Sequence, residues 1–258
     1  MLRFRNLGSG STGNATVVEA GSGVHTRRLL VDCGLGIREL DRRLALAGLL
    51  AEQIDAVFIT HEHADHIGCA RGFSRRHGAP VWMSAGTHAA LNQPDLNGAL
   101  RIAQDSTDID LGELQVTPFT VPHDAREPLQ LRCSDGAVTL GILTDLGHVT
   151  SHVIEHLQGC DAMLLECNHD AQMLASGPYP DFLKRRVAGK HGHLSNDDAV
   201  ALAQAIDHAG LVHIFAAHLS QQNNRPDIVR NALSAALGRA FDDIGIAHPT
   251  DGTPWVSL

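Results

Sequence analysis

Residues 60–68 read THEHADHIG, and they place three histidines and one aspartate within six consecutive positions. The segment overlaps the end of IDAVFIT (54–60), whose apolar and β-branched residues predict a buried strand. Neutral imidazole and carboxylate groups are the ligands that zinc and related divalent ions take in proteins. Because one short segment cannot easily wrap four ligands around a single ion, the H-x-H-x-D-H pattern predicts two adjacent metals.

Further candidate ligands stand at the ends of other apolar runs. His123 follows TPFTVP, Asp145 follows GILT, and His218 follows HIFAA. Strand ends open into loops, and loops on a rigid scaffold carry binding and catalytic groups. We therefore expect these side chains to join segment 60–68 in a single site.

Apolar runs alternate with helical patterns along the chain, which predicts an α/β protein with helices covering a mixed sheet. Ser195, with Asp198 three residues later, is expected to cap the helix that follows it. The predicted helices are 37–48, 64–78, 195–210 and 225–237. The predicted strands are 27–34, 54–60, 80–84, 113–123, 161–167, 211–218 and the hairpin 128–145, which turns at 134–136.

The pattern H-x-H-x-D-H resembles the signature of the metallo-β-lactamase superfamily. The segments LGSGSTGNATVVEAG (7–21), LLVDCGL (29–35) and TDLG (144–147) are similar to its WalJ/YycJ-type hydrolases, which are related to ribonuclease Z. The resemblance implies a four-layer αββα sandwich in one domain, residues 1–258, with the site at one edge between two sheets. It also implies a first metal bound by His61, His63 and His123, a second bound by Asp65, His66 and His218, and a bridging Asp145.

The same resemblance implies a dinuclear metal-dependent phosphodiesterase. The expected activity is that of a nuclease, of the 5′-to-3′ exonuclease type on single-stranded DNA, with a hydroxide shared by the two metals as nucleophile. Zinc or manganese is expected, and iron is also compatible with these ligands. Two other interpretations stay open: hydrolysis of a small acyl substrate such as a thioester or lactone, and a non-catalytic metal-binding role.

A general acid is implied by two further segments, DAMLLEC (161–167) and GHLSNDDAVALAQA (192–205). By resemblance to ribonuclease Z, Glu166 orients His193, and His193 protonates the leaving oxygen. The metal ligand Asp65 is expected to be the third catalytic residue. A neighbouring carboxylate raises the pKa of a histidine and fixes its tautomer, which suits a general acid near neutral pH. This chain departs from the family pattern at Leu165, where the relatives carry a histidine before the glutamate.

Phosphate contacts are expected from two polar segments, SGSTGN (9–14) and KRRVAGKHGHLS (184–195). Small residues expose backbone N–H groups, and a basic edge can hold phosphates on an acidic protein. The alternatives are a plain turn and a solvated helix face. His148 and His169 are possible neighbours of the site, whereas His191 is not expected to be a ligand. The candidate phosphate contacts are Ser9, Ser11, Lys184, Arg185 and Lys190.

The composition is that of a globular protein, with a formal net charge of −9 over 258 residues. The negative charge argues against a protein that binds nucleic acid non-specifically over its whole surface. A local basic cleft could still bind a nucleic acid or another phosphodiester substrate. No apolar stretch approaches the length of a membrane span, and the first residues lack the apolar core of a signal peptide. The five scattered cysteines fit reduced thiols, so we expect a cytoplasmic protein of undetermined oligomeric state.

Overall fold

The computed structural model describes residues 1–258 and contains two seven-stranded sheets. The first sheet has the order β14-β1-β2-β3-β4-β5-β6, and the second has the order β13-β12-β11-β10-β9-β8-β7. Each sheet has an antiparallel part and a parallel part, so the mixed arrangement expected from the hairpin is confirmed. The first sheet comprises β1 (Leu2–Gly8), β2 (Ala15–Gly21), β3 (Thr26–Val31), β4 (Ala56–Phe58), β5 (Val81–Ser84), β6 (Leu100–Ala103) and β14 (Val256–Ser257). The second comprises β7 (Ile109–Asp110), β8 (Gln115–Thr120), β9 (Leu129–Ser134), β10 (Thr139–Leu143), β11 (Ala162–Glu166), β12 (His213–Ala217) and β13 (Ile244–Ile246).

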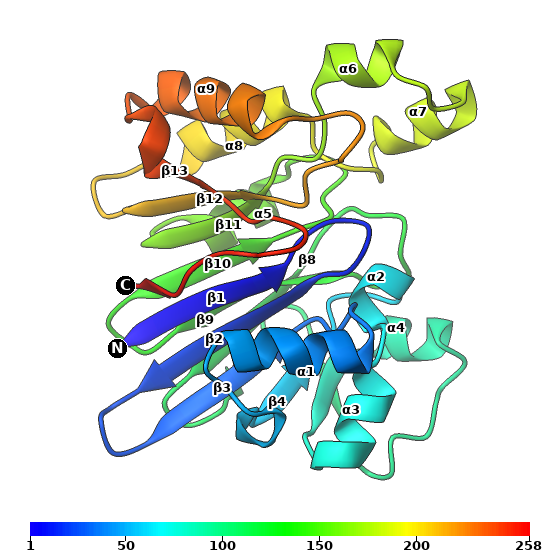
Figure 1. Cartoon of the computed structure of the whole chain (residues 1–258), viewed down its shortest axis with the longest axis vertical. Helices are drawn as coiled ribbons and strands as arrows, with labels where there is room; N and C mark the ends of the chain where they lie inside the picture. Colours follow the sequence, from blue (N-terminus) through cyan, green and yellow to red (C-terminus); the bar gives the residue numbers. More distant parts are fainter.

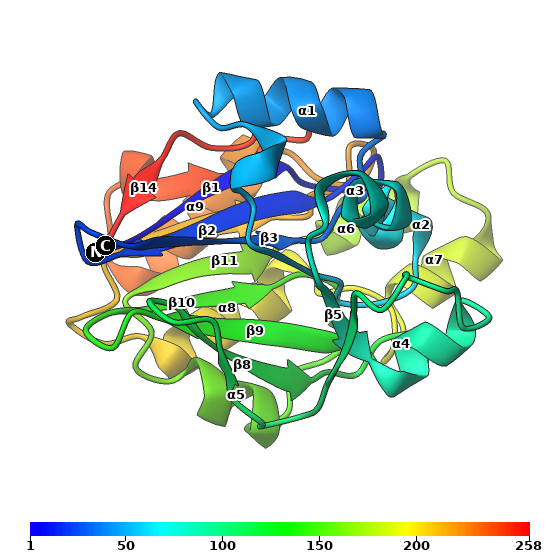
Figure 2. The ribbon, with the colours of Figure 1, turned by 90° about the horizontal axis from the view of Figure 1, so that it is seen from below.

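Helices cover the outer face of each sheet, and Figure 2 shows the four layers from the side, with α1 above the two sheets and α5 and α8 below them. The predicted αββα sandwich is therefore confirmed. The helices beside the first sheet are α1 (Ile37–Leu46), α2 (Ala64–Ile67), α3 (Ala70–His77) and α4 (Ala85–Ala90). Those that follow strands of the second are α5 (Ser151–Leu157), α6 (Ala171–Ser176), α7 (Asp181–Val187), α8 (Asn196–Ile206) and α9 (Pro226–Leu237). Single 3₁₀ turns occupy Ala51–Gln53 and Phe241–Asp243.

Three separate hydrophobic cores hold the four layers together. One core of 22 buried residues, including Phe4 and Leu131, fills the space between the sheets. A second, also of 22 residues, packs α5, α8 and α9 on the second sheet, and a third of 20 residues packs α1 and α3 on the first. Burial of apolar surface is the main stabilising term in folding, so each interface contributes to the sandwich.

The chain is not helical throughout 64–78, so that sequence prediction is wrong. The helix breaks at Gly68, whose φ of 27° lies in the left-handed region, and α2 and α3 form on either side. A side chain at Gly68 would collide with the backbone of Cys33 and Gly34. The break lets the Cys33 amide donate to the His66 carbonyl at 2.8 Å, which fixes the histidine-rich loop against the end of β3.

The two sheets bring several strand ends to one edge of the sandwich. Figure 1 places this edge at the end that carries α2, α4 and α7, away from the two chain termini. Asp32, Asp145 and His218 each follow a strand and have φ values of 61°, 61° and 54°. Left-handed backbone is uncommon for residues other than glycine and clusters at functional sites, where surrounding contacts hold it. No helix in the structure combines the length and apolar character needed to span a bilayer.

Replacing Gly34 with alanine should damage both the fold and this edge. A Cβ at Gly34 would collide with the carbonyl group of Asp65. We expect Gly34→Ala to lower the free energy of unfolding by about 1–3 kcal/mol, the usual cost of overpacking, in urea denaturation. Gly36→Ala is the matched control, because a Cβ there meets nothing within 4 Å. Equal free energies of unfolding for the two variants would contradict the close approach of Gly34 to the Asp65 carbonyl group.

Candidate metal centre and catalytic pair

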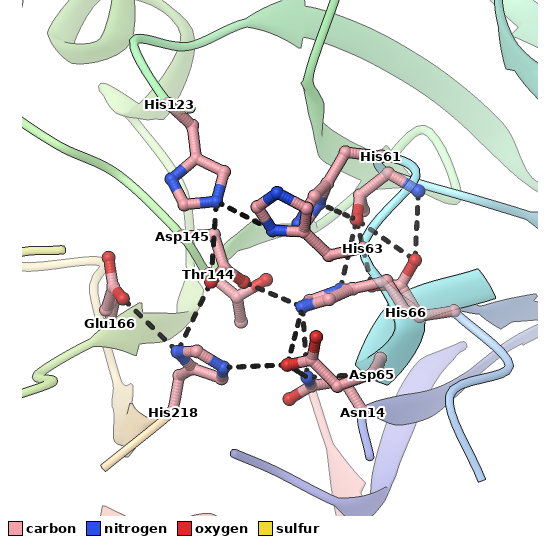
Figure 3. Close-up of polar contacts among 12 residues, drawn as sticks. Asn14, His61, His63, Asp65, His66, His123, Thr144, Asp145, Glu166 and His218 are labelled. Carbon is pink, nitrogen blue, oxygen red and sulfur yellow. Dashed lines mark hydrogen bonds and ion pairs between the residues drawn. The ribbon is translucent and has the colours of Figure 1, made fainter. Parts of the chain in front are cut away.

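Three histidines form the first candidate metal-binding group. His61 and His63 lie in the loop after β4, and His123 lies after β8 in the second sheet. One ligand nitrogen from each lies within 4.8 Å of the others, and His63 Nδ1 is 3.4 Å from His123 Nε2. The group therefore joins the two sheets at their shared edge (Figure 3).

A second group lies beside the first and contains one carboxylate. Asp65 Oδ2 is 3.5 Å from His66 Nε2 and 3.6 Å from His218 Nε2. Asp145 lies between the two groups, with Oδ2 at 3.0 Å from His66 Nε2 and Oδ1 at 3.9 Å from His123 Nε2. The seven residues expected to be ligands thus come together, with Asp145 in contact with both groups.

The histidines are oriented through their second ring nitrogens. Such outer partners fix the tautomer, so that the remaining nitrogen presents a lone pair to a metal. His63 differs from the others because it turns Nδ1 rather than Nε2 toward the site. The donor–acceptor pairs are His61 Nδ1 to Thr60 Oγ1 (3.0 Å), His63 Nε2 to the Asp124 carbonyl (3.2 Å), His66 Nδ1 to Asp32 Oδ2 (2.7 Å), His123 Nδ1 to the Gly192 carbonyl (3.0 Å) and His218 Nδ1 to Glu166 Oε1 (3.3 Å).

Unpaired buried atoms show that the site fits metal ions. His61 Nε2 and His218 Nε2 are buried and have no hydrogen-bond partner. A buried polar atom without a partner is costly, and a metal ion at each group would satisfy both. Histidine nitrogens with carboxylate oxygens suit zinc, manganese or iron. The clustered groups are consistent with a dinuclear site.

The pKa values of four candidate ligand histidines shift in two opposite directions. Burial lowers the pKa of His61 and His123, so both imidazoles are neutral and ready to bind a metal. Burial also opposes charge on His218, but Asp145, Asp65 and Glu166 raise its pKa to about 10. Asp145 and Asp32 likewise raise the pKa of His66 well above its ordinary value. His66 and His218 are therefore protonated until a metal displaces their protons.

Glu166 and His193 form a hydrogen-bonded pair beside the metal centre. His193 Nδ1 donates to Glu166 Oε1 at 2.8 Å, which leaves Nε2 for a substrate. Burial alone would raise the pKa of Glu166, but the charge and hydrogen bond of His193 lower it to about 2. Burial alone would lower the pKa of His193, but Glu166 and Asp145 raise it. The pair therefore holds a proton on His193 near neutral pH.

Two adjacent loops position this pair. The amide of Asn168 donates to the Leu194 carbonyl at 3.1 Å, and the amide of Asn196 donates to the His169 carbonyl at 2.8 Å. Ser195 caps α8 as predicted, with its Oγ accepting from the Asp198 amide at 3.1 Å. The start of α8 is thus fixed beside the end of β11, which places His193 next to Glu166.

Three residues that orient ligands were missed by sequence reasoning. Asp32 accepts from His66 and from the Thr60 amide at 2.9 Å, and Asn14 Nδ2 donates to Asp65 Oδ2 at 3.3 Å. Asp32 follows the apolar run LLV, so the strand-end criterion that identified Asp145 would also have found it. Asn14 and Thr60 carry no such signal, because their roles depend on which loops meet.

The site opens onto a pocket of about 330 Å³. Asp65, Asp145, His193 and His218 line it, and Leu183, Arg186 and Val187 of α7 form one wall. A larger depression of about 390 Å³, lined by Arg132 and Glu155 among others, contains none of the clustered ligands. The metal centre therefore identifies the smaller pocket as the functional one.

The expected phosphate contacts separate into residues at the pocket and residues away from it. Ser11 lines the pocket, whereas Ser9 is buried and its Oγ accepts from the His218 amide at 2.7 Å. Lys184 Nζ donates to the Ala175 carbonyl at 2.6 Å. Lys184, Arg185 and Lys190 are not part of the pocket lining, whose basic residue from this run is Arg186. Ser9 thus orients a ligand rather than facing a substrate.

The remaining candidate histidines lie outside the pocket lining. His169 is buried, and burial lowers its pKa. His148 Nδ1 donates to the Lys190 carbonyl at 2.8 Å, and the exposed ring of His191 lies 6.4 Å from that of His148. These residues belong to the loops around the site and not to its ligand groups.

Comparison with known proteins decides the family. The Beta-lactamase superfamily domain matches residues 27–214. This chain belongs to the metallo-β-lactamase superfamily. It is 34% identical to a Bacillus anthracis protein named exodeoxyribonuclease YycJ, covering 97% of this chain and 96% of that protein. It is 30% identical to exodeoxyribonuclease WalJ of Streptococcus pneumoniae, covering 100% and 98%.

Solved structures support the same fold. The metallo-β-lactamase fold protein YhfI from Bacillus subtilis superposes with a TM-score of 0.75 at 18% identity, over 100% of both chains. The resemblance to WalJ/YycJ-type members of the superfamily is confirmed by the full-length matches. With its His/Asp metal site, this chain is a hydrolase of the metallo-β-lactamase superfamily.

Metal binding by this superfamily member should release protons. Because a metal requires neutral imidazole and the pKa values of His66 and His218 are raised, binding must displace roughly one proton from each. Affinity should therefore rise as the pH increases from about 6 to about 9. Titration calorimetry in buffers of different ionisation enthalpy measures the protons released, and elemental analysis should give two ions per chain. An affinity independent of pH would contradict this protonation.

Proposed function

We propose that residues 1–258 form a single catalytic domain that hydrolyses phosphodiesters in nucleic acid, as a nuclease acting on single-stranded DNA ends. The observation that carries the proposal is the metal centre with an adjacent Glu166–His193 pair in one pocket. Full-length relatives named exodeoxyribonucleases support the choice of DNA and of exonuclease action. The five free cysteines suit the reducing cytoplasm in which we place the enzyme.

The chain's own residues would position the reacting groups. Two divalent ions held by the clustered ligands, zinc, manganese or iron, would supply Lewis acidity to phosphate oxygens and a hydroxide at neutral pH. Asp145 is buried, and His218 and His66 hold its pKa well below the ordinary value despite that burial. It therefore stays ionised between the two groups of ligands. The left-handed backbone at Asp145 and His218 aims both side chains into the pocket.

His193 would supply the proton that the leaving oxygen needs. Its Nδ1 is held by Glu166, so Nε2 is the nitrogen available in the pocket. Departure of an alkoxide is difficult without protonation, and a positioned acid typically contributes about 10²–10⁴-fold to the rate. Glu166 acts through His193 and His218, since its carboxylate is fully buried and is not part of the pocket lining.

The proposed activity is tested with a single-stranded oligonucleotide and Mn²⁺ or Zn²⁺. We expect cleavage by the wild-type chain, and loss of cleavage together with loss of one metal ion in Asp65→Ala, because Asp65 is the one carboxylate that only the second group uses. Asp227→Asn on the exposed start of α9 is the control and should cleave normally. Hydrolysis of thioesters or lactones without cleavage of any phosphodiester would overturn the proposal in favour of an acyl hydrolase.

The role of His193 is tested by the choice of leaving group. On an oligonucleotide, His193→Ala should lower kcat by about 100-fold or more, because the alkoxide then leaves unprotonated. On bis-p-nitrophenyl phosphate the loss should be much smaller, since p-nitrophenolate is stable without a proton. Steady-state kinetics on both substrates measures the difference. The same loss on both would rule out a general acid and indicate a structural role.

A further inference from the structure

Helix α7 is unusual because it has no buried residue. It projects from the body of the sandwich together with α6, beside the edge that carries the site (Figure 1). Its Phe182 side chain is 67% exposed, the most exposed aromatic residue among the large hydrophobic side chains. Most helices in proteins are stabilised by burying an apolar face, so α7 is maintained by something other than core packing.

Polar contacts hold α7 at the mouth of the pocket. Arg186 Nε lies 2.6 Å from Asp124 Oδ2, and the His193 amide donates to the Val187 carbonyl at 2.8 Å. Lys184 ties the helix to the end of α6 through the Ala175 carbonyl. These contacts connect α7 directly to the loop of the proton donor and to the residue that follows the ligand His123.

One face of α7 already belongs to the site. Leu183, Arg186 and Val187 line the pocket, at the spacing that places residues on one side of a helix. Phe182 lies four residues before Arg186, so the two are neighbours on the helix surface. The pocket wall therefore continues outward from an arginine to an exposed aromatic ring.

From this continuity we infer that α7 is a binding surface for the nucleotides that flank the scissile bond, with Phe182 stacking on an unpaired base and Arg186 holding a phosphate. The inference rests on the proposed function and adds how the single strand is held: by a base that stacks on Phe182 and a phosphate bound by Arg186. Aromatic stacking requires an unpaired base, and it tolerates any sequence because every base has a π face.

Charge supports a nucleic acid as the occupant. The chain carries a formal net charge of −9, yet Lys184, Arg185, Arg186 and Lys190 gather on and after α7. A polyanion is attracted to this local surface although the protein as a whole repels it. Asp124 shares the Arg186 guanidinium, so part of that group is held in position while its other nitrogens stay available for a phosphate.

Steady-state kinetics on a single-stranded oligonucleotide tests the surface. We expect Phe182→Ala to raise KM by about tenfold, the effect of losing one stacked base, and Phe182→Trp to restore it. Arg186→Ala should make the dependence of log affinity on log salt shallower by about 0.7, the value for one phosphate contact on a single strand. The matched controls are Phe241→Ala and Arg75→Ala, an exposed aromatic and an exposed arginine away from the pocket lining.

Binding of a fluorescent oligothymidylate, measured by anisotropy, separates this inference from the proposed function. An unchanged KM and an unchanged affinity in Phe182→Ala would overturn the role of α7, even if the wild-type chain cleaves phosphodiesters. If no phosphodiester is cleaved but Phe182→Ala still weakens oligonucleotide binding by about tenfold, the α7 surface stands and the phosphodiesterase proposal fails. An equal loss in the Phe241→Ala control would also contradict a specific role for Phe182.

Discussion

The fully buried carboxylate of Glu166 connects the parts of the site that lie on the second sheet. Oε1 accepts from His193 and His218, and Oε2 accepts from the amides of Leu146 at 2.6 Å and Leu194 at 3.3 Å. A buried charge is costly unless its lone pairs are satisfied, and here each oxygen has two donors. The candidate ligand His218, the neighbouring His193 and the loop after Asp145 are therefore fixed by one group.

The first sheet has a counterpart in Asp32. Its carboxylate joins the Thr60 amide to His66, and this holds the histidine-rich loop in place at the end of β3. Each sheet thus supplies a buried carboxylate that orients a ligand histidine, and the metal ligands lie between them. Because such outer partners set the affinity and geometry of a metal site, the packing of the two sheets and the chemistry at their edge depend on one another.

The two groups of candidate ligands differ in their charge. Carboxylates concentrate at the second group of ligands, where they raise the pKa of His66 and His218, whereas burial lowers the pKa of His61 and His123 in the first group. A divalent cation is therefore attracted to the centre. Arg186 of α7 lines the same pocket and places one positive charge beside this acidic group.

The sequence by itself indicated the fold family and the seven residues that cluster at the candidate metal centre, because H-x-H-x-D-H is a local pattern and because polar residues at strand ends can be recognised from apolar runs. It also indicated Glu166 and His193, although not the loop pairing that brings them to 2.8 Å. Only the tertiary structure decided that the helix breaks at Gly68, that Ser9 holds the His218 backbone, and that Arg186 rather than Lys184, Arg185 or Lys190 reaches the pocket. These outcomes depend on contacts between segments far apart in the chain and on the rotation of a helix relative to its neighbours, and neither is encoded in the local order of residues.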